Sequence, residues 1–278
     1  MPPIRRKRSW RRAVADAARN APERGRELRA AAAQLDLPWA RSLPARFIRE
    51  RFMQLVLIPV IDYYAARRAT GRERLASVKG PVILVANHSS HMDTPVILSA
   101  LPRRLRKRTA VAAAADYFYR NRLVASLVSL LFNTVPIERR GGGLSKNGSH
   151  LDKLLEQGWS LLLYPEGTRA RAGMPRRVRR GAAVLAAAHN LTIVPIRVTG
   201  TADAMPPGRV WPRRLRRGPL PRRHRIEVSF GEPIPPAGDP AAMIERVQSF
   251  FDGGSSSASP YRRFASRSSS GDTLNVGG

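Results

Sequence analysis

The stretch Pro81-Val-Ile-Leu-Val-Ala-Asn-His88-Ser-Ser-His-Met-Asp93-Thr-Pro95 decides the fold of this chain, because an apolar run ends in a group of polar side chains. The run 82–86 is short and rich in β-branched residues, which predicts a strand buried on both faces. Asp93 or the threonine after it can cap a following helix, with Pro95 at the first helical position. Open α/β sheets bind ligands at the carboxyl ends of their strands, so the sequence predicts a site at His88 and Asp93.

The spacing of His88 and Asp93 lets the turn fold the carboxylate back onto the imidazole. A carboxylate that accepts from one ring nitrogen fixes the tautomer, and the other nitrogen can then take a proton from a hydroxyl. No serine or cysteine nucleophile is needed if that hydroxyl belongs to the substrate. Two alternatives stay open: a helix-capping aspartate beside a structural histidine, and a metal site formed by His88, His91 and Asp93. The other histidines, His150, His189 and His224, are scattered and show no ligand spacing.

Length and composition leave room for one large α/β domain with appendages. The chain has 278 residues, of which 43% are hydrophobic, and this is enough for a full core. Cysteine is absent, which excludes disulfides and thiolate metal sites and fits a reducing compartment. The net charge of +29 and the pI near 11.8 predict attraction to nucleic acid, to anionic membranes or to acidic substrates.

The chain divides by composition into three parts. Residues 1–42 form a basic extension, residues 43–251 a catalytic domain, and residues 252–278 a Ser/Gly-rich tail that we expect to be disordered. No apolar stretch follows the basic start, so we expect a cytoplasmic protein rather than a secreted one. The basic extension is either an arm that lies on anionic lipid headgroups or a solvated extension.

A helix that changes from amphipathic to apolar is predicted from Pro44 to about Arg68. Its uncharged apolar part, 52–61, is well short of the roughly 20 residues that span a bilayer. The helix is therefore expected either in the core or at a membrane interface, where it would dock the domain. The apolar stretch 123–132 allows the same two interpretations.

Strand, polar turn and helix then repeat along the chain. Apolar stretches at 109–114, 135–138, 158–164, 191–198 and 225–230 predict strands, and the segments 117–131, 145–157, 182–188 and 240–251 predict helices. This alternation predicts an α/β fold with a single mixed, largely parallel sheet flanked by helices, preceded by N-terminal helices.

Two arginines follow predicted strands and suggest a phosphate site. Arg139 comes after the strand 135–138, and Arg169 ends the turn Pro165-Glu166-Gly167-Thr168-Arg169 after the next strand. Gly167 permits a positive φ or a close approach of the backbone to a ligand. Two converging guanidinium groups can bind a phosphate bidentately, whereas the alternative is that each arginine forms a surface salt bridge.

Four blocks in order resemble the glycerolipid acyltransferases of the PlsC type: Asn87-His88-x-x-x-x-Asp93, Val135-Pro-Ile-Glu-Arg139, Tyr164-Pro-Glu166-Gly167-Thr168-Arg169 and Val194-Pro195-Ile196. The resemblance covers roughly 75–234 and implies a glycerol-3-phosphate acyltransferase-like fold. It implies that His88 is the general base and that Asp93 orients it. It also implies that Arg139, Glu166, Gly167, Thr168 and Arg169 bind the glycerol phosphate, and that the Val-Pro-Ile block shapes the acyl-donor or membrane side. Asn133, Pro136 and the Arg179-Arg180-Gly181 triplet depart from the common pattern and leave the acceptor's identity open.

The resemblance implies a 1-acylglycerol-3-phosphate O-acyltransferase of phospholipid biosynthesis. We expect it to move an acyl group from acyl-CoA or acyl carrier protein to the free hydroxyl of lysophosphatidic acid or a related lysophospholipid. Backbone N–H groups at the helix start after Asp93 are expected to stabilise the oxyanion. No metal and no bound cofactor are expected, and the enzyme would lie as a peripheral or monotopic protein on the cytoplasmic face of an anionic cell membrane. The alternatives are a basic nucleic-acid-binding protein, suggested by the charge alone, and a metallohydrolase that uses His88, His91 and Asp93.

Overall fold

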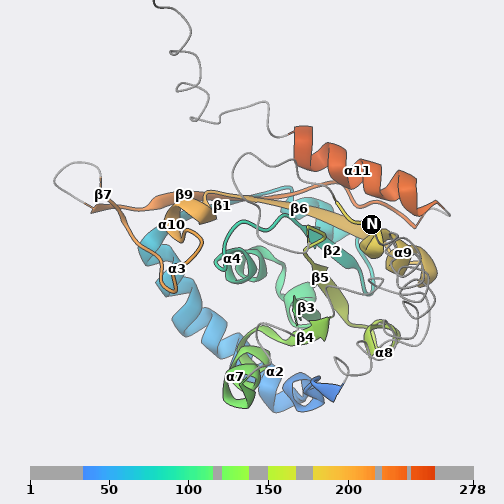
Figure 1. Ribbon diagram of the computed structural model, residues 1–278, viewed down its shortest axis with the longest axis horizontal. Coiled ribbons are helices and arrows are strands. Elements are labelled where there is room, and N and C mark those ends of the chain that lie inside the picture. The colour runs from blue at the N-terminus through green and yellow to red at the C-terminus, as the bar shows by residue number, and fades with distance from the viewer. Residues whose placement is uncertain are drawn as a thin grey trace, which may run out of the picture.

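The apolar run before His88 is strand β2 (Ile83–Ala86), and it lies in the middle of a seven-stranded sheet (Figure 1). The computed structural model describes residues 34–114, 121–137, 150–166, 178–216, 221–236 and 239–253. The strand order is β1-β9-β6-β2-β5-β3-β4. The other six strands are β1 (Ala65–Thr70), β3 (Thr109–Ala114), β4 (Thr134–Ile137), β5 (Ser160–Leu163), β6 (Ile193–Thr199) and β9 (His224–Phe230).

Strand directions make the sheet mixed and largely parallel, so the predicted fold class is confirmed. β2 pairs in parallel with β5 and β6, and β3 pairs in parallel with β4 and β5. β9 runs antiparallel to β6, and β1 runs parallel to β9. The carboxyl ends of β2, β3, β4, β5 and β6 therefore share one edge of the sheet, which is the edge where His88 lies.

Alternate side chains of β2 face two separate cores, as expected for a strand that is buried on both sides. Leu84 and Ala86 pack in a cluster with apolar residues of the helix that follows β2 and of the N-terminal helices. Ile83 and Val85 pack in a second cluster with three later helices. The molecule is thus a three-layer structure with helices on both faces of the sheet (Figure 1).

Helices with different positions in the sequence cover the two faces. The face of Leu84 is covered by α4 (Asp93–Ala100) and by residues of η2 (Met53–Leu57) and α3 (Ile58–Tyr64). The opposite face is covered by α8 (His150–Glu156), α9 (Gly181–Ala188) and α11 (Pro240–Gly253). The remaining helices among the described residues are η1 (Pro38–Arg41), α2 (Leu43–Phe52), η3 (Arg72–Ala76), α5 (Arg103–Arg106), α7 (Arg122–Phe132) and α10 (Thr201–Ala204).

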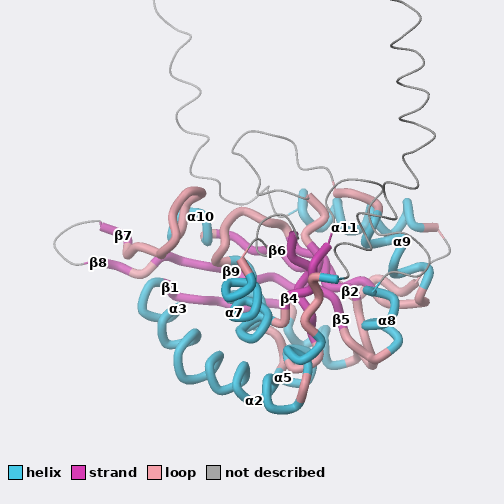
Figure 2. The backbone as a smooth tube through the Cα atoms, turned by 60° about the horizontal axis from the view of Figure 1, so that its bottom comes forward, coloured by secondary structure: helices cyan, strands magenta, loops and turns pink. Residues whose placement is uncertain are grey.

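The N-terminal helices follow one another without a break in helical backbone from α2 through η2 to α3 (Figure 2). The middle segment η2 is a π-helical turn, and Pro59 follows it near the start of α3. A π turn re-routes backbone hydrogen bonds, and this accommodates a proline that lacks an N–H. Among the described residues, no helix combines the length and the apolar character needed to cross a bilayer.

The predicted helix from Pro44 to about Arg68 is wrong at its end, because the helix stops at Tyr64 and strand β1 follows. The sequence Ala-Ala-Arg-Arg-Ala-Thr shows no apolar alternation, so it carries no local signal for a strand. Its conformation depends instead on pairing with β9, which is about 160 positions further along the chain. The short helices α5 and α10 and the two-stranded sheet of β7 (Leu215–Arg216) and β8 (Pro221–Arg222) were not predicted either.

The three predicted parts of the chain are tested only at their borders. Most of the basic extension 1–42 and most of the tail 252–278 lie outside the described residues. Within 34–42 the chain already forms η1. The tail was predicted to begin at Asp252, but Asp252 and Gly253 complete α11, whose Val247 and Phe251 are buried.

Candidate active site

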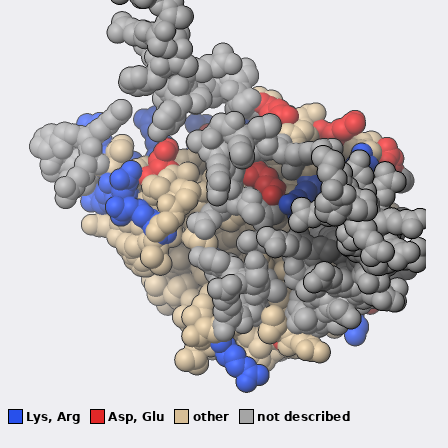
Figure 3. Space-filling view, in the orientation of Figure 1, with Lys and Arg blue, Asp and Glu red and all other residues tan. Residues whose placement is uncertain are grey.

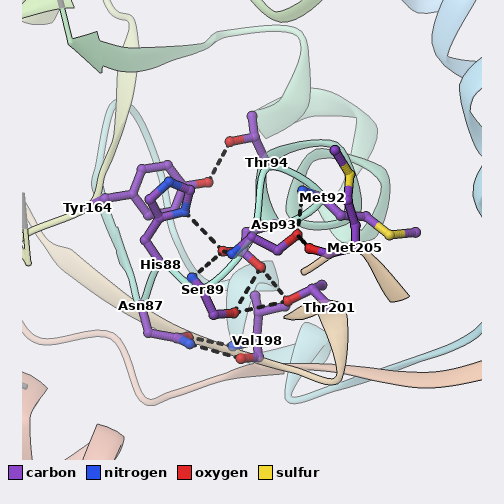
Figure 4. A network of polar contacts seen from close by, with 11 residues as sticks. Asn87, His88, Ser89, Met92, Asp93, Thr94, Tyr164, Val198, Thr201 and Met205 are labelled. Atoms are coloured by element: carbon purple, nitrogen blue, oxygen red, sulfur yellow. Dashed lines mark hydrogen bonds and ion pairs between the residues drawn. The ribbon is translucent and has the colours of Figure 1, made fainter. Parts of the chain in front are cut away.

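The turn after β2 brings the two predicted catalytic residues together (Figure 4). The Nδ1 atom of His88 lies 2.9 Å from Oδ2 of Asp93. The Asp93 side chain is fully buried, whereas the His88 side chain is 19% exposed. The pair therefore has one end fixed in the protein and one end that a substrate can reach.

Asp93 does not cap the helix in the predicted way. It is the first residue of α4 and Pro95 is the third, and the N-cap position belongs to Met92, whose side chain makes no capping bond. The carboxylate instead folds back onto the turn, where Oδ2 accepts the N–H groups of Ser89 (2.6 Å) and Ser90 (2.8 Å). Two backbone N–H groups and the ring nitrogen Nδ1 of His88 therefore converge on this oxygen, next to the N-terminus of α4.

The other carboxylate oxygen of Asp93 faces a pair of hydroxyl groups. The Thr201 hydroxyl donates to Oδ1 at 2.5 Å, and the Ser89 hydroxyl lies 3.4 Å from the same oxygen. Thr201 is fully buried and begins α10, directly after Gly200. Gly200 has φ 82°, and a Cβ there would come within 2.0 Å of the Arg225 carbonyl oxygen, so only glycine can lead the chain into α10.

Asn87 fastens the catalytic turn to the neighbouring strand β6. Its side-chain amide donates to the carbonyl oxygen of Val198 (2.8 Å), and its side-chain oxygen accepts the N–H of the same residue (2.6 Å). The side chain therefore replaces one step of backbone pairing at the end of β2. This bond and the Thr201 bond both connect the His–Asp turn to the region after the Val-Pro-Ile block.

The ring of Tyr164 packs against the imidazole ring of His88. Its ring centroid lies 4.4 Å from that of His88, with an interplanar angle of 30°, and its hydroxyl is 2.7 Å from the Thr94 hydroxyl. Burial and the nearby charge of Asp93 raise the pKa of Tyr164, so the phenol stays protonated. The contact restricts the His88 ring without adding a second titrating group beside it.

This arrangement suits general-base catalysis. With Nδ1–H donating to Asp93, Nε2 of His88 carries the lone pair, and none of the described residues forms a hydrogen bond with it. A hydroxyl placed at Nε2 can lose its proton as it attacks an electrophile, and the carboxylate stabilises the resulting imidazolium.

Four N–H groups of the turn that leads into α4 already have partners, so they are not free to bind an oxyanion. The N–H groups of Ser89 and Ser90 are bound to Asp93, that of Met92 is bound to the Ser90 hydroxyl, and that of Asp93 is bound to the Ser90 carbonyl. These four donors stabilise the turn and the carboxylate. We expected N–H groups after Asp93 to stabilise the oxyanion, and that role stays a prediction.

The metal hypothesis requires His88, His91 and Asp93 to converge. In the part of the chain that the structure describes, which includes all three, no group of three or more histidine, aspartate or glutamate side chains could hold a metal ion. The Asp93 oxygens are directed toward backbone N–H groups and hydroxyls, as well as toward His88.

The predicted phosphate-binding residues are described only in part. Glu166 is half-buried and follows Tyr164 and Pro165 after the carboxyl end of β5. Arg139, Gly167, Thr168 and Arg169 lie outside the described residues. Their convergence on a phosphate stays a prediction.

Three residues of the site were missed by sequence reasoning: Thr201 and Ser89 as partners of Asp93, and Tyr164 as a partner of His88. Tyr164 stands immediately before the Pro-Glu-Gly turn, so its place at a strand end was a usable signal. Thr201 is 108 positions from Asp93, and only the glycine before it marked the end of β6.

A histidine base at the carboxyl end of a central strand, held by a buried aspartate, defines a class of sites that activate a hydroxyl group or water for attack. Comparison with known proteins narrows this class. The acyltransferase family model matches residues 66–199, which include β2, the catalytic turn and β6. Residues 66–199 therefore resemble the acyltransferase family, and the predicted resemblance to glycerolipid acyltransferases is confirmed.

Three curated relatives show the range of this similarity. The chain is 34% identical over 164 residues to N-acylphosphatidylethanolamine synthase of Arabidopsis thaliana, covering 55% of this chain and 56% of the relative. It is 30% identical over 144 residues to the chloroplastic 1-acyl-sn-glycerol-3-phosphate acyltransferase LPAT1 of the same plant (50% and 37%). It is 27% identical over 158 residues to human 1-acyl-sn-glycerol-3-phosphate acyltransferase alpha (55% and 53%). The aligned region thus spans between 37% and 56% of the length of these relatives.

The fold also resembles a solved structure. The crystal structure of the 1-acyl-sn-glycerophosphate acyltransferase PlsC from Thermotoga maritima superimposes with a TM-score of 0.55 at 19% identity. The match covers 75% of this chain and 77% of that one. At this identity the likeness supports the three-layer fold with its mixed sheet.

Proposed function

We propose that this protein transfers a fatty acyl group from acyl-CoA or acyl carrier protein to the free hydroxyl of lysophosphatidic acid or a related lysophospholipid, in phospholipid biosynthesis. The observation that carries the proposal is the His88–Asp93 pair at the end of β2, within the residues that resemble the acyltransferase family. Relatives named as 1-acyl-sn-glycerol-3-phosphate acyltransferases support the choice of acceptor.

In the proposed reaction, Nε2 of His88 takes the proton of the acceptor hydroxyl while the oxygen attacks the thioester carbonyl. The carbonyl becomes a tetrahedral oxyanion, which collapses with cleavage of the carbon–sulfur bond. The imidazolium then returns the proton to the leaving thiolate, so the products are an ester and a free thiol. Asp93 stabilises the imidazolium and keeps the ring in its tautomer. Base and nucleophile are both supplied without a bound cofactor.

The acceptor phosphate is assigned to the residues that follow β4 and β5. Both strands run parallel to β2, so their carboxyl ends lie on the same edge of the sheet as His88. Arg139 follows β4 two positions after its last residue, and Glu166 to Arg169 follow β5. Bidentate binding by arginine would hold the phosphate, and the backbone near Gly167 could approach it closely.

Exposed apolar side chains support the proposed membrane association. Every large hydrophobic side chain that is exposed among the described residues lies in one of three short regions: Leu35, Trp39, Leu43, Phe47, Ile48, Leu55, Val56 and Tyr63 at the N-terminal helices, Leu123, Val124 and Leu127 on α7, and Val210 and Trp211. Clustered exposed apolar side chains mark an interaction surface, and amphipathic helices commonly lie in the bilayer interface.

The two main helices of this surface are held together by a buried arginine. Arg49 of α2 donates to the carbonyl oxygens of Leu130 (2.8 Å) and Ser129 (3.0 Å) near the end of α7, and to that of Ala40 (2.6 Å). Burial, with the charges of Arg46 and Arg41, lowers the pKa of Arg49 to about 10, so the side chain stays charged at neutral pH. We assign the surface to the cytoplasmic face of the cell membrane, as a peripheral or monotopic contact that the basic residues 1–42 would strengthen.

A second acceptor class deserves a test, because one relative is named as an N-acylphosphatidylethanolamine synthase. In that case the acceptor would be the amine of a phosphatidylethanolamine headgroup, and His88 would take a proton from nitrogen. The same His–Asp pair suits both acceptors.

The deciding experiment is a radiolabelled acyl-transfer assay with acyl-CoA and with acyl-acyl carrier protein as donors. The acceptors are lysophosphatidic acid, other lysophospholipids, glycerol 3-phosphate and phosphatidylethanolamine. We expect labelled phosphatidic acid, or the diacyl product of a related lysophospholipid. Labelled product from phosphatidylethanolamine alone would favour the second acceptor class. The proposal would be overturned if no combination of donor and acceptor gave product and the protein bound nucleic acid tightly.

A further inference from the structure

A segment outside the four sequence blocks, 205–216, starts at the catalytic turn and runs to the far end of α3. The carbonyl oxygen of Met205 accepts the hydroxyl of Ser90 at 2.7 Å. The Met205 N–H is bound to the carbonyl of Thr201, which also holds Asp93. The segment is therefore joined directly to the residues that position the His–Asp pair.

Aromatic contacts fix the middle of the segment against α3. The indole N–H of Trp211 donates to the Tyr64 hydroxyl at 2.8 Å, and the two rings meet edge to face with centroids 6.4 Å apart. Tyr64 in turn meets Tyr63 edge to face at 4.9 Å, and the Arg214 guanidinium lies 5.0 Å from the centre of the Tyr63 ring. The polar group of Trp211 is thus satisfied, and the remaining ring surface is held in place.

The apolar parts of this cluster nevertheless face outward. Val210 is 89% exposed, Trp211 61% and Tyr63 57%. Tyr63 also belongs to the exposed apolar side of the N-terminal helices, so the two surfaces meet there. A fixed and exposed apolar cluster of this kind indicates a surface that a partner covers.

The charge of the segment points to the chemistry of that partner. Arg209 and Arg213 flank Val210 and Trp211, and both are exposed. The sequence 205–216 contains no acidic residue. In the space-filling view, basic side chains gather on the side of the molecule where β7 lies, with acidic atoms on one side of them and an uncharged area on the other (Figure 3).

We propose that the 205–216 segment is a second membrane contact, in which Val210 and Trp211 enter the headgroup layer and Arg209 and Arg213 bind the phosphates of anionic lipids. Tryptophan and tyrosine favour this boundary because their rings are apolar with one polar group, and arginine is attracted to the negative surface. An acidic protein or a nucleic acid would match the arginines but would leave the valine and the adjoining exposed apolar side chains uncovered. The proposal rests on the membrane association proposed above. It adds that the bonds from Met205 and Thr201 hold the catalytic turn at a set position relative to the lipid surface.

The test uses the full-length protein and co-sedimentation with two kinds of vesicle, phosphatidylcholine alone and phosphatidylcholine mixed with phosphatidylglycerol. The first variant is Arg209→Gln/Arg213→Gln, and its control is Lys153→Gln/Arg246→Gln, which removes the same charge from exposed positions on α8 and α11. These two helices lie away from β7 (Figure 1). A basic residue near an anionic surface contributes about a fivefold factor in affinity, so the first variant should lose about 25-fold on anionic vesicles and the control far less.

The second variant, Val210→Asp, tests insertion. It should lower binding to both kinds of vesicle by about tenfold, because it removes apolar burial and adds a charge to the headgroup layer. The proposal would be overturned if both variants bound vesicles as tightly as the wild type does. It would also be overturned if the variants bound vesicles normally but bound acyl carrier protein or nucleic acid more weakly than the wild type. Acyl transfer in detergent micelles is measured in parallel. Its absence in every protein, wild type included, would refute the proposed function, whereas the vesicle comparison alone decides this inference.

Discussion

Replacing Asp93 with asparagine isolates the contribution of one buried charge, because the structure dictates how the amide must sit. Three donors, from His88, Ser89 and Ser90, converge on Oδ2, whereas Oδ1 faces hydroxyl groups of Ser89 and Thr201. An amide nitrogen at the position of Oδ2 would face two backbone N–H groups, and a donor cannot form hydrogen bonds with other donors. The asparagine oxygen should therefore take the place of Oδ2, and its NH₂ group can donate to hydroxyls that are able to accept.

In this orientation the His88 tautomer is kept and only the charge is lost. A charge-assisted hydrogen bond contributes about 1.5–3 kcal/mol, so kcat should fall about 10- to 150-fold with little change in KM. The melting temperature should change by only about 2–4 °C for each kcal/mol of stability lost. Steady-state kinetics and thermal melts on Asp93→Asn and wild type measure both quantities. Unchanged kcat, or a loss of activity that merely follows unfolding, would refute this reasoning.

Three further predictions concern other parts of the molecule. Tyr164→Phe keeps the ring against the imidazole and loses one hydrogen bond of about 1 kcal/mol, so kcat should fall less than tenfold, while Tyr164→Ala should cost far more at equal expression. Arg169→Ala and Arg139→Ala should raise KM for the phosphorylated acceptor about 10- to 100-fold and leave KM for the thioester nearly unchanged, and equal effects on both substrates would reject the phosphate assignment. Burial opposes ionisation of Glu50, yet the hydrogen bond and charge of Arg106, with other basic neighbours, lower the pKa of Glu50. The ionised carboxylate therefore stabilises the folded protein fully at pH values above the pKa of Glu50 in the unfolded chain. This stabilisation is lost as the pH falls through the lower pKa of the folded state. Glu50→Gln should therefore destabilise the protein by about 1–3 kcal/mol at pH 7 in urea titrations and by much less near pH 3, and a difference that does not change with pH would contradict this assignment.

Local patterns were sufficient for the centre of the fold. The β-branched run before His88 and the strand 109–114 are buried, and such runs carry their own signal of a strand that is covered on both faces. The predicted His88–Asp93 contact followed from a short turn, in which sequence spacing restricts the geometry. The edge strand β1 gave no such signal, because its two arginines and three alanines form a strand only through pairing with β9.

The site was predictable where its contacts are local and unpredictable where they cross the sheet. Thr201 reaches Asp93 because β6 lies beside β2 in the sheet. The spacing of residues along the sequence does not show that these two strands are neighbours. The hydrogen bonds within the turn itself were not predicted either. The Asp93 carboxylate, the Ser90 hydroxyl and the Ser90 carbonyl accept the N–H groups of this turn, and the spacing of the residues gave no indication of these bonds. The position of the site at the carboxyl ends of the strands can therefore be predicted from the sequence. The hydrogen-bond partners of the site residues can be identified only from the structure.

The most direct test of the central claim is transfer of a radiolabelled acyl group from a thioester to lysophosphatidic acid, compared between wild type, His88→Ala and His91→Ala, with vesicle binding as a check on folding. The account predicts that wild type and His91→Ala form labelled phosphatidic acid and that His88→Ala is slower by about 10²–10⁴-fold while it still binds vesicles. Transfer by folded His88→Ala at the wild-type rate would contradict it, as would equal loss in both variants with activity that chelators abolish and zinc or manganese restores.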